Sequence, residues 1–512
     1  MSNRDRRLSA VRATATIPNS SAHHASPEHP SRWRSLATSV AAVALLAACD
    51  GGGPGEEVED PAQVEAEPDE QDEAPADDAA AGLAAVGETA PDDVPSEVDL
   101  DALEGLPVLS GLAWVLEAIG PQGPPEPAEV EAALNDEFLQ MAPPEVLIDQ
   151  LAQIQGEWSV VSLIEVEGDR LAVEIAWEDE QAQLMLEVTD EDPPELAMLG
   201  IAPPMGDPAE FEDWDEAEQA LTGLGDEVVY LAARIDDDGV CEPIASHEPD
   251  QRGPLASTFK LYVLGALIDA VEEGRIGWED ELEITEQLVS LPSGVLQTED
   301  PGTMVTVAEA AELMIEVSDN TGTDLLIDLL GRETIEDAQA DYGHTDPSVN
   351  RPFITTREMF QLSASPEDTE AFVAADEDGR RQVLEGLADQ PLPDPAELQL
   401  EPSLPQQPEW YASPAEMCDA LVAIDEASTG QDMQPAREAF GAEPPPRIDD
   451  EWALIGGKAG GQPGVHAQAW LLDRDDTRYA FTISIDHDDH IDTTQLIPVL
   501  EGAVNLMADD LP

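Results

Sequence analysis

The spacing of apolar residues changes along the chain, and each change predicts a different kind of element. Apolar residues recur at helical intervals over 106–119 and 127–154, whereas 158–168, 170–179 and 182–192 have the pattern of successive β-strands joined by turns. Helices followed by a meander of strands predict a small α+β domain over residues 98–206.

Helical and strand patterns continue after residue 207. We expect a helix over 208–222, a strand over 228–235 and a further helix that begins near residue 257 and stops at Gly274. This last helix is apolar on nearly every face, which is typical of a buried helix. Towards the C-terminus, strands over 466–473 and 479–486 precede a helix over 493–507.

The N-terminal hundred residues follow neither pattern. Arginines precede the short apolar stretch SLATSVAAVALLAAC, which fits the core of an export signal and is too short to span a bilayer. Its end resembles a bacterial lipobox, so we expect a lipoprotein signal region over 1–49, lipidation at Cys49 and a membrane-anchored exported protein; an ordinary signal or an uncleaved anchor is the alternative. Residues 50–97 are rich in Ala, Pro, Glu and Asp and predict a disordered acidic tether.

Composition narrows the range of partners. The chain carries 112 acidic and 21 basic residues and a net charge of −91, which repels nucleic acid phosphates and excludes a nucleic-acid-binding function. Only two of its basic residues are lysines, Lys260 and Lys458, so their positions are informative. We expect a small-molecule substrate, no cofactor, no metal site and a monomeric protein.

The first lysine lies three residues after a serine. Ser257 and Lys260 begin the apolar helix, and their spacing places them on one helical face about one turn apart. A lysine in so apolar a helix is desolvated, which favours its neutral, basic form. A neutral lysine can take the proton of a serine hydroxyl, so the pair predicts an activated nucleophile.

Two further motifs complete a set. Ser318-Asp319-Asn320 falls between two apolar helices, and Lys458-Ala459-Gly460 precedes the C-terminal strands. SxxK, SDN and KxG in this order are the motifs of penicillin-interacting serine enzymes. Residues 207–512 therefore resemble a class A β-lactamase-type catalytic domain, which implies an antiparallel sheet flanked by helices and an all-helical subdomain. Both lysines occupy positions where this family needs one.

The resemblance implies a role for each matched residue. Ser257 would be the acylated nucleophile and Lys260 its activating partner, while Ser318 would pass a proton to the leaving group with electrostatic support from Lys458. The substrate would be bound by Asn320, by Gly460 and by Gly461, whose backbone N–H would form the oxyanion hole with that of Ser257. Asp319 would brace its own loop.

Two departures from the family pattern affect the second half of the reaction. Ala459 stands where the family usually has a hydroxyl that helps to bind the substrate carboxylate. The ExxLN motif, whose glutamate activates the deacylating water, is absent between Gly331 and Phe360. Glu131 to Asn135 match its letters, but they precede the nucleophile and fit an amphipathic helix in the front domain.

Two other features point to a subfamily. A charged, Pro-rich insertion occupies about 364–408, and the third motif reads KAGGQPGV. Together with the small domain in front, this resembles the clavulanic-acid-cluster type of fusion, in which a steroid-isomerase-like domain precedes a β-lactamase-like domain. That resemblance implies that ester hydrolysis is more natural than strong β-lactamase action.

Two remaining groups of residues leave alternatives open. His and Asp residues crowd together over 485–490; they could be drawn as a metal site, but in so acidic a chain a solvated connection is the better interpretation. Cys241 and Cys418 could form a disulfide in an exported protein, although the sequence does not show that they do.

The sequence therefore predicts an exported serine acyl hydrolase that forms a Ser257 acyl-enzyme with a β-lactam, an ester or a D-alanyl amide. A carboxylesterase or D-alanyl peptidase with little β-lactam turnover is the alternative within enzymes. A lipoprotein that binds a β-lactam or a cell-wall fragment without hydrolysing it is the alternative of another class.

Overall fold

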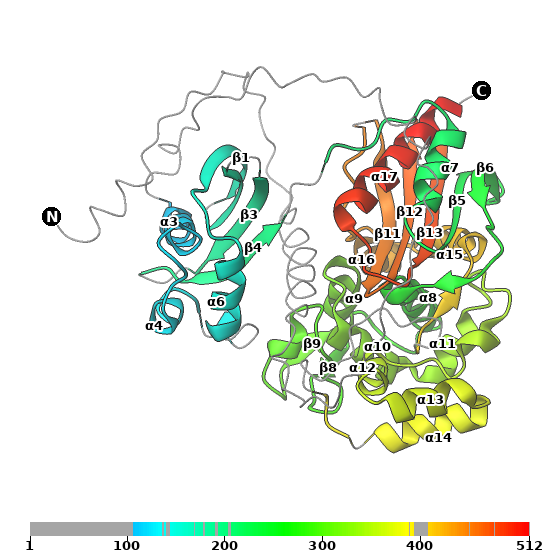
Figure 1. Cartoon of the computed structure of the whole chain (residues 1–512). Coiled ribbons are helices and arrows are strands. Elements are labelled where there is room, and N and C mark those ends of the chain that lie inside the picture. The colour runs from blue at the N-terminus through cyan, green and yellow to red at the C-terminus, as the bar shows by residue number, and fades with distance from the viewer. Residues whose placement is uncertain are drawn as a thin grey trace, which may run out of the picture.

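A computed structural model describes residues 106–510, apart from 136–137, 140–143, 168, 178–179, 190–192, 203–205, 389, 394–407, 450 and 476. The expected fold class is confirmed, because helices are combined with antiparallel sheets (Figure 1). The signal region with Cys49, the predicted tether and the insertion over 394–407 lie outside the described residues. In the part of the chain that the structure describes, no helix combines the length and the apolar character needed to cross a membrane.

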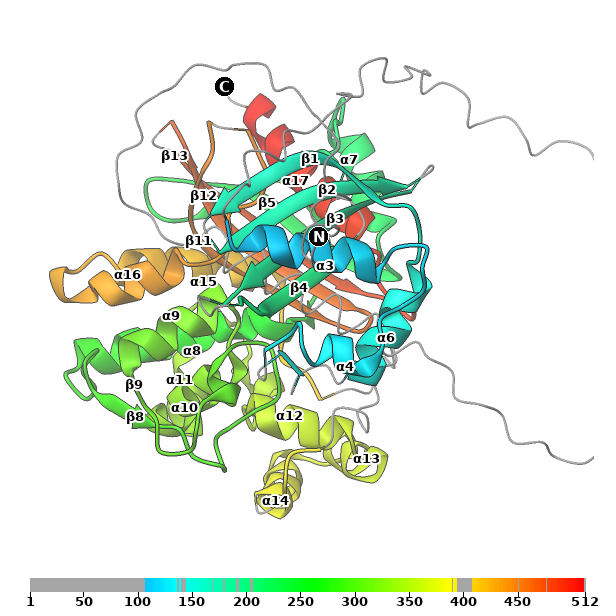
Figure 2. The ribbon, with the colours of Figure 1, turned by 90° about the vertical axis from the view of Figure 1, so that its left-hand side faces the viewer.

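The first part of the chain forms a four-stranded antiparallel meander in the order β1-β2-β3-β4. Its elements are α3 (Val108–Ala118), α4 (Pro127–Val130), α6 (Pro144–Gln153), β1 (Ser159–Glu167), β2 (Arg170–Trp177), β3 (Glu180–Val188) and β4 (Leu196–Ala202). Helix α3 lies across one face of this sheet (Figure 2), where Leu112 and Val115 are buried against Leu184 and Leu186. Alternating apolar residues on the strands supply the other half of this core.

Two sequence expectations for this region need correction. A fourth strand, β4, was not predicted; it pairs with β3 and completes the meander. The helix expected over 127–154 is broken: α4 stops at Val130, residues 131–133 form a turn, and Leu134 makes an isolated bridge to Leu196. Glu131 is therefore an exposed turn residue and not part of an amphipathic helix.

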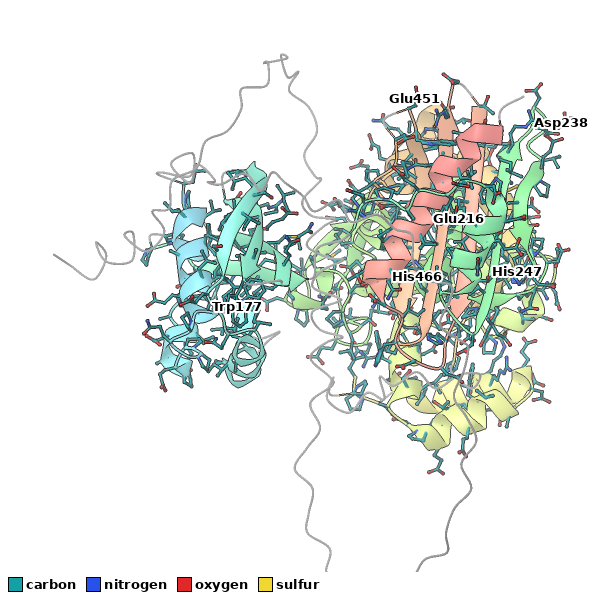
Figure 3. All side chains as sticks on the ribbon, turned by 45° about the horizontal axis from the view of Figure 1, so that its top comes forward. Trp177, Glu216, Asp238, His247, Glu451 and His466 are labelled. Atoms are coloured by element: carbon teal, nitrogen blue, oxygen red, sulfur yellow. A yellow bond between two sulfur atoms is a disulfide. The ribbon has the colours of Figure 1, made fainter. Side chains whose placement is uncertain are left out.

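The second part of the chain is built on a five-stranded antiparallel sheet in the order β11-β12-β13-β5-β6. Its strands are β5 (Glu227–Ile235), β6 (Cys241–His247), β11 (Ala453–Gln462), β12 (Val465–Arg474) and β13 (Thr477–Asp486). Figure 3 places Asp238 and Glu451 at one end of this sheet and His247 and His466 at the other. Strand β11 is an edge strand, so one side of its backbone is free to face the site.

Helices cover both faces of the five-stranded sheet. Helices α7 (Trp214–Thr222) and α17 (Thr493–Leu506) lie on one face, where Leu221, Leu496 and Leu500 join the strands in a core. Helices α8 (Lys260–Glu272), α15 (Pro414–Ala427) and α16 (Gln434–Phe440) contribute to the core on the other face (Figure 1). The helix expected over 208–222 begins only at Trp214, because Asp213 caps its N-terminus.

The remaining helices form the expected helical subdomain. They are α9 (Val307–Glu316), α10 (Asn320–Leu330), α11 (Arg332–Ala338) and α12 (Thr356–Ser363), together with the short strands β8 (Glu281–Glu283) and β9 (Met304–Thr306). The insertion contains two further helices, α13 (Pro366–Ala374) and α14 (Glu377–Leu387), which lie at the lower edge of Figure 1. Each is capped by an acidic or hydroxyl side chain, from Ser365 and Asp376 respectively.

A disulfide joins Cys241 on β6 to Cys418 on α15. The pairing that the sequence left open is therefore present, and it closes a loop of 177 residues. The bond links the outer strand of the sheet to a helix that packs on the inner face, so it fixes the sheet against the helical layer.

Candidate active site

The candidate nucleophile lies on a strained turn before a buried helix. A 3₁₀ turn, η2 (Ala256–Phe259), leads directly into α8, whose first residue is Lys260. Ala256 has a φ of 41°, in the left-handed region that non-glycine residues rarely adopt, and such strain is typical of functional turns. Ser257 follows it and is half-buried, so the turn presents its hydroxyl at the start of the helix.

Lys260 is completely buried and points at the SDN motif. Its Nζ lies 2.5 Å from the backbone oxygen of Ser318, 3.1 Å from Ser318 Oγ and 2.8 Å from Asn320 Oδ1. Burial, reinforced by repulsion from Lys458, holds the pKa of Lys260 well below its usual range. The side chain is therefore suited to act as a neutral base.

The contacts of Lys260 join it to both polar side chains of the SDN motif. Its Nζ donates to the Ser318 carbonyl, to Ser318 Oγ and to Asn320 Oδ1. This arrangement gives a direct proton path between Lys260 and Ser318.

The SDN motif forms a second strained turn, which Lys260 contacts. Ser318 has a φ of 54°, and Ser293 Oγ donates to its carbonyl at 2.8 Å. Asp319 is buried and accepts from the backbone N–H groups of Val295, Leu296 and Gly322 at 2.6, 2.9 and 2.7 Å. Asp319 thus caps α10 and ties the 293–296 loop to it, which holds Ser318 in place.

Asn320 is oriented from both ends of its amide. Its Oδ1 accepts from Lys260, and its Nδ2 donates to the carbonyl of Leu291 at 3.0 Å. The Asn320 side chain is only 6% exposed, so it is turned away from solvent. Its amide connects Lys260 to the 290–296 loop.

Lys458 lies on β11 and is also buried. Its Nζ is 3.4 Å from Glu443 Oε2 and donates to the carbonyl of Ala459 at 2.9 Å. Glu443, only 5% exposed, supplies the buried opposite charge that a buried ammonium needs. Lys458 is close enough for its charge to contribute to the lowered pKa of Lys260, so the two lysines of the chain lie in one region of the structure.

Gly460 is the point where β11 meets the nucleophile turn. A Cβ added at this position would lie 2.5 Å from the carbonyl oxygen of Leu255, 2.6 Å from Ser257 N and 2.8 Å from Thr258 N. Only glycine permits so close an approach of two backbones. The residue therefore sets the distance between β11 and Ser257.

The next residue, Gly461, offers a backbone donor beside Ser257. Strands β11 and β12 are joined by a two-residue turn that Gln462 and Val465 close, and Gly461 pairs with His466. Because hydrogen-bonded and non-bonded pairs alternate, the N–H of Gly461 points away from β12, towards the free edge of β11. Among the described residues Ser257 N has no hydrogen-bond partner either. The two N–H groups are thus available to one oxyanion.

Two acidic residues that contact the candidate site were not predicted from the sequence. Glu443 neutralises Lys458, and Glu409 accepts hydrogen bonds from Ala256 N, Trp410 N and the Gln462 side chain. Burial raises the pKa of Glu409 to about 8. Among 112 acidic residues no local pattern distinguishes these two.

Other candidates from the sequence lie away from the site. Glu131 belongs to the four-stranded part of the chain, so its ExxLN match is a coincidence of letters. In the 485–490 segment His487 Nδ1 contacts Asp226 Oδ2 at 2.7 Å, which ties the end of β13 to the residue before β5. Among the described residues no group of three or more His, Cys, Asp or Glu side chains is placed to hold a metal ion.

Comparison with known proteins gives two family matches. Residues 225–498, slightly more than half of the chain, match the model described as the beta-lactamase enzyme family. Residues 107–193 match the model of the ORF 12 gene product N-terminal region. No curated protein matches the chain.

Several solved structures are similar to this chain over somewhat more than half of its length. A β-lactamase from Sphaerobacter thermophilus DSM 20745 is 20% identical with a TM-score of 0.41, and the match covers 59% of this chain and 100% of that one. A β-lactamase from Desulfarculus baarsii DSM 2075 is 17% identical, with a TM-score of 0.42 and coverage of 59% and 100%. A PBP-A mutant in acyl-enzyme complex with penicillin G is 18% identical, with a TM-score of 0.42 and coverage of 58% and 96%.

Proposed function

The chain belongs to the beta-lactamase enzyme family, and on this premise we propose that it is a serine acyl hydrolase that works through an acyl-enzyme at Ser257. The observation that carries the proposal is the convergence of three motifs from distant parts of the sequence. Lys260 contacts Ser318 and Asn320, and burial together with the charge of Lys458 lowers its pKa. Family membership by itself supports the broader statement, a serine hydrolase.

On this proposal acylation proceeds in four steps. Neutral Lys260 takes the Ser257 hydroxyl proton while Oγ forms a bond to the carbonyl carbon of the substrate. The carbonyl oxygen gains the electron pair and is stabilised by the N–H groups of Ser257 and Gly461. The C–N or C–O bond of the substrate then breaks. The leaving group takes a proton from Ser318 Oγ, which Lys260 replenishes across their 3.1 Å contact.

Deacylation has a less complete set of groups. Water must add to the acyl carbonyl and release Ser257, and no ExxLN glutamate follows the SDN motif before Phe360. Ala459 also lacks the hydroxyl that would help to bind a substrate carboxylate. We infer that the acyl-enzyme is released slowly and that the acyl donor is a β-lactam, an ester or a D-alanyl amide, with simple esters favoured over strong β-lactam turnover.

The test is an incubation of the whole protein with a chromogenic β-lactam and, separately, with a p-nitrophenyl ester, followed by intact mass measurement. High salt is included because a net charge of −91 repels itself at low ionic strength. Turnover that disappears in Ser257→Ala supports the hydrolase, and a lasting adduct without turnover supports capture of the ligand without hydrolysis. Absence of both adduct and turnover contradicts the proposal.

We also propose that the protein is exported and anchored by a lipid at Cys49, and that its front domain is of the steroid-isomerase-like kind found in the clavulanic-acid-cluster type of fusion. The N-terminal motif supports the first idea, and the match of residues 107–193 to the ORF 12 N-terminal model supports the second. Labelling of producing cells with a radioactive fatty acid should mark the wild type and not Cys49→Ser. The absence of label from the wild type would contradict lipidation.

A further inference from the structure

Glu409 connects the two backbone segments that carry the oxyanion-hole donors. Its Oε1 accepts from Ala256 N at 3.1 Å, and Ala256 immediately precedes Ser257. Its Oε2 accepts from Gln462 Nε2 at 2.5 Å, and Gln462 immediately follows Gly461. One carboxyl group therefore joins the two residues that flank the donors.

The segment that carries Glu409 is itself rigidly attached to the nucleophile turn. Trp410 O accepts from Leu255 N at 2.9 Å, and β10 (Tyr411–Ala412) pairs with β7 (Gly253–Pro254). The ring of Trp410 stacks on Phe259, with centroids 3.6 Å apart and planes 14° from parallel. Movement of residues 409–412 would therefore move the turn that carries the nucleophile.

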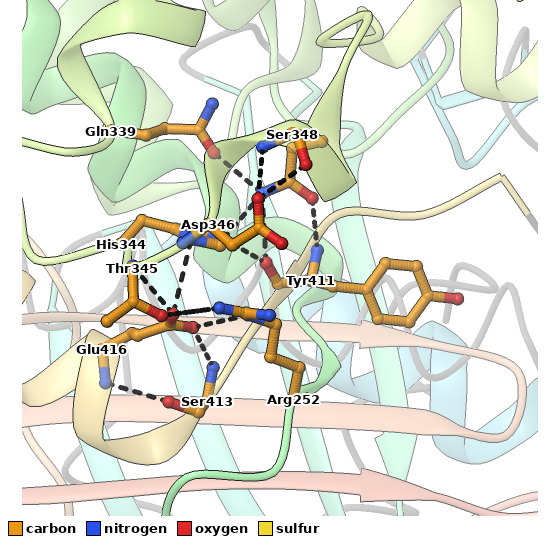
Figure 4. A network of polar contacts seen from close by, with 10 residues as sticks. Arg252, Gln339, His344, Thr345, Asp346, Ser348, Tyr411, Ser413 and Glu416 are labelled. Atoms are coloured by element: carbon orange, nitrogen blue, oxygen red, sulfur yellow. Dashed lines mark hydrogen bonds and ion pairs between the residues drawn. The ribbon is translucent and has the colours of Figure 1, made fainter. Parts of the chain in front are cut away.

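A network behind β10 fixes the same segment to the helical subdomain (Figure 4). Asn350 Oδ1 accepts from Tyr411 N at 2.8 Å, and His344 Nε2 donates to Tyr411 O at 2.8 Å. Beneath them Arg252 makes two hydrogen bonds to Glu416, at 3.0 and 2.6 Å, and Glu416 caps α15 just after β10. These hydrogen bonds hold in place the segment that follows Glu409.

We propose that Glu409 is a positioning residue that sets the separation between Ser257 N and Gly461 N, and so tunes the oxyanion hole. The inference rests on the proposed function, because an oxyanion hole matters only if Ser257 is acylated. Oxyanion donors stabilise the transition state because they are held in place before the negative charge develops. A link between the two backbone segments that carry these donors therefore affects the transition state more than substrate binding.

The environment of Glu409 argues against a role as the missing water-activating base. The side chain is 8% exposed, and its two oxygens already bind three N–H groups. Burial raises its pKa to about 8, and a protonated carboxyl can keep both backbone bonds on one oxygen while the other donates to a turned Gln462 amide. The link that Glu409 makes between Ala256 and Gln462 thus depends on shape and hydrogen bonding and not on a negative charge.

The test compares Glu409→Ala, Glu409→Gln, Gln462→Ala and the Glu409→Ala/Gln462→Ala double variant with the wild type. Single-turnover acylation by a p-nitrophenyl ester and a chromogenic β-lactam gives the rate constant and the half-saturating concentration separately. All rates are divided by the titre of acylatable Ser257, so a loss of folded protein does not count as a loss of rate. Glu501→Gln is the matched control, because Glu501, which lies on α17 away from the site, is a buried carboxylate bound to Arg447.

We expect Glu409→Ala to lower the acylation rate constant by about 10- to 100-fold with little change in half-saturation, less than the loss of a whole donor. Glu409→Gln should restore the rate to within about threefold, since glutamine keeps the acceptor for Ala256 N and Trp410 N. Gln462→Ala should cost about 3- to 10-fold, and the double variant should be no slower than Glu409→Ala, because the two residues act through one tether.

The outcomes separate this inference from the function on which it rests. If the wild type forms no Ser257 adduct, the proposed function fails and the inference fails with it. If the wild type is acylated but Glu409→Ala keeps a rate per titrated site within about twofold, Glu409 has no positioning role. If Glu409→Ala does not fold, Gln462→Ala decides, and an unchanged rate in that variant overturns the inference.

Discussion

Substitution of Gly460 tests how closely β11 must approach the turn that carries Ser257. In Gly460→Ala the new Cβ would lie 2.5 Å from the carbonyl oxygen of Leu255, where ordinary contact begins at 3.4 Å. Ser257 N and Thr258 N would be almost as close, at 2.6 and 2.8 Å. All three are backbone atoms, so no side chain can turn aside, and the two segments must separate by about 0.9 Å.

The separation should affect catalysis more than folding. Strand β11 is at the edge of the sheet and can shift as a unit, so we expect a folded variant destabilised by about 1–3 kcal/mol, the usual cost of overpacking. A displacement near 1 Å in an active site costs about 10²-fold, and the acylation rate should fall by that order. Single-turnover acylation with thermal melting and circular dichroism measures both effects.

The control is Gly386→Ala on α14, where an added Cβ meets nothing within 4 Å. It should acylate like the wild type and melt at the same or a slightly higher temperature, since alanine favours a helix. A folded Gly460→Ala protein that acylates within about threefold of the wild type would refute the steric reasoning, because it would show that the contact between β11 and the turn is not close in solution.

Three other predictions follow from buried groups. Lys260→Arg should abolish adduct formation as completely as Lys260→Ala, because arginine remains charged. The acylation rate of the wild type should rise with pH only through the lowered pKa of Lys260 and then stay level. An Arg variant that still forms the mass adduct would contradict the role of a neutral amine. Reduction of the Cys241–Cys418 disulfide should destabilise the protein by up to about 5 kcal/mol, because the bond closes a 177-residue loop and so limits the entropy of the unfolded chain. The melting temperature should fall by on the order of 10 °C. An unchanged melting temperature with both thiols titratable would contradict this. Burial alone would raise the pKa of Glu416, but hydrogen bonds from Arg252 and its neighbours lower it to about 2, so the stability that the ionised group contributes is present above about pH 4.5 and is lost as the pH falls towards 2. The difference in melting temperature between the wild type and Glu416→Gln should therefore shrink over that range, and a difference that stays constant would contradict the assignment.

The elements that carry the motifs could be predicted because their patterns are local. The helix after Ser257 is apolar on nearly every face and ends at Glu272, two residues before Gly274, which has a φ of 70°. Composition and one glycine were therefore enough to place its C-terminal end to within two residues. The last two strands and the C-terminal helix likewise have their own periodicity. The burial of Lys260 followed from its apolar neighbours in the same helix.

The residues that shape the site from outside the motifs could not be predicted, since their partners are distant in sequence. Glu409 binds Ala256 across 153 residues, and only the fold shows which of many acids does so. The pairing of Cys241 with Cys418 depends in the same way on the placement of β6 against α15. Strand β4 and the break after Val130 were missed because short apolar segments fit more than one element.

The burial of both lysines has a practical consequence for chemical labelling. The chain contains two ε-amines, Lys260 and Lys458, with exposed fractions of 0% and 3%. Reagents such as N-hydroxysuccinimide esters, which usually mark many surface positions, would find no ε-amine on the surface of the folded protein. Incorporation of such a label at either lysine therefore reports opening of the structure around the candidate site, and its rate measures how often these buried side chains are exposed to solvent.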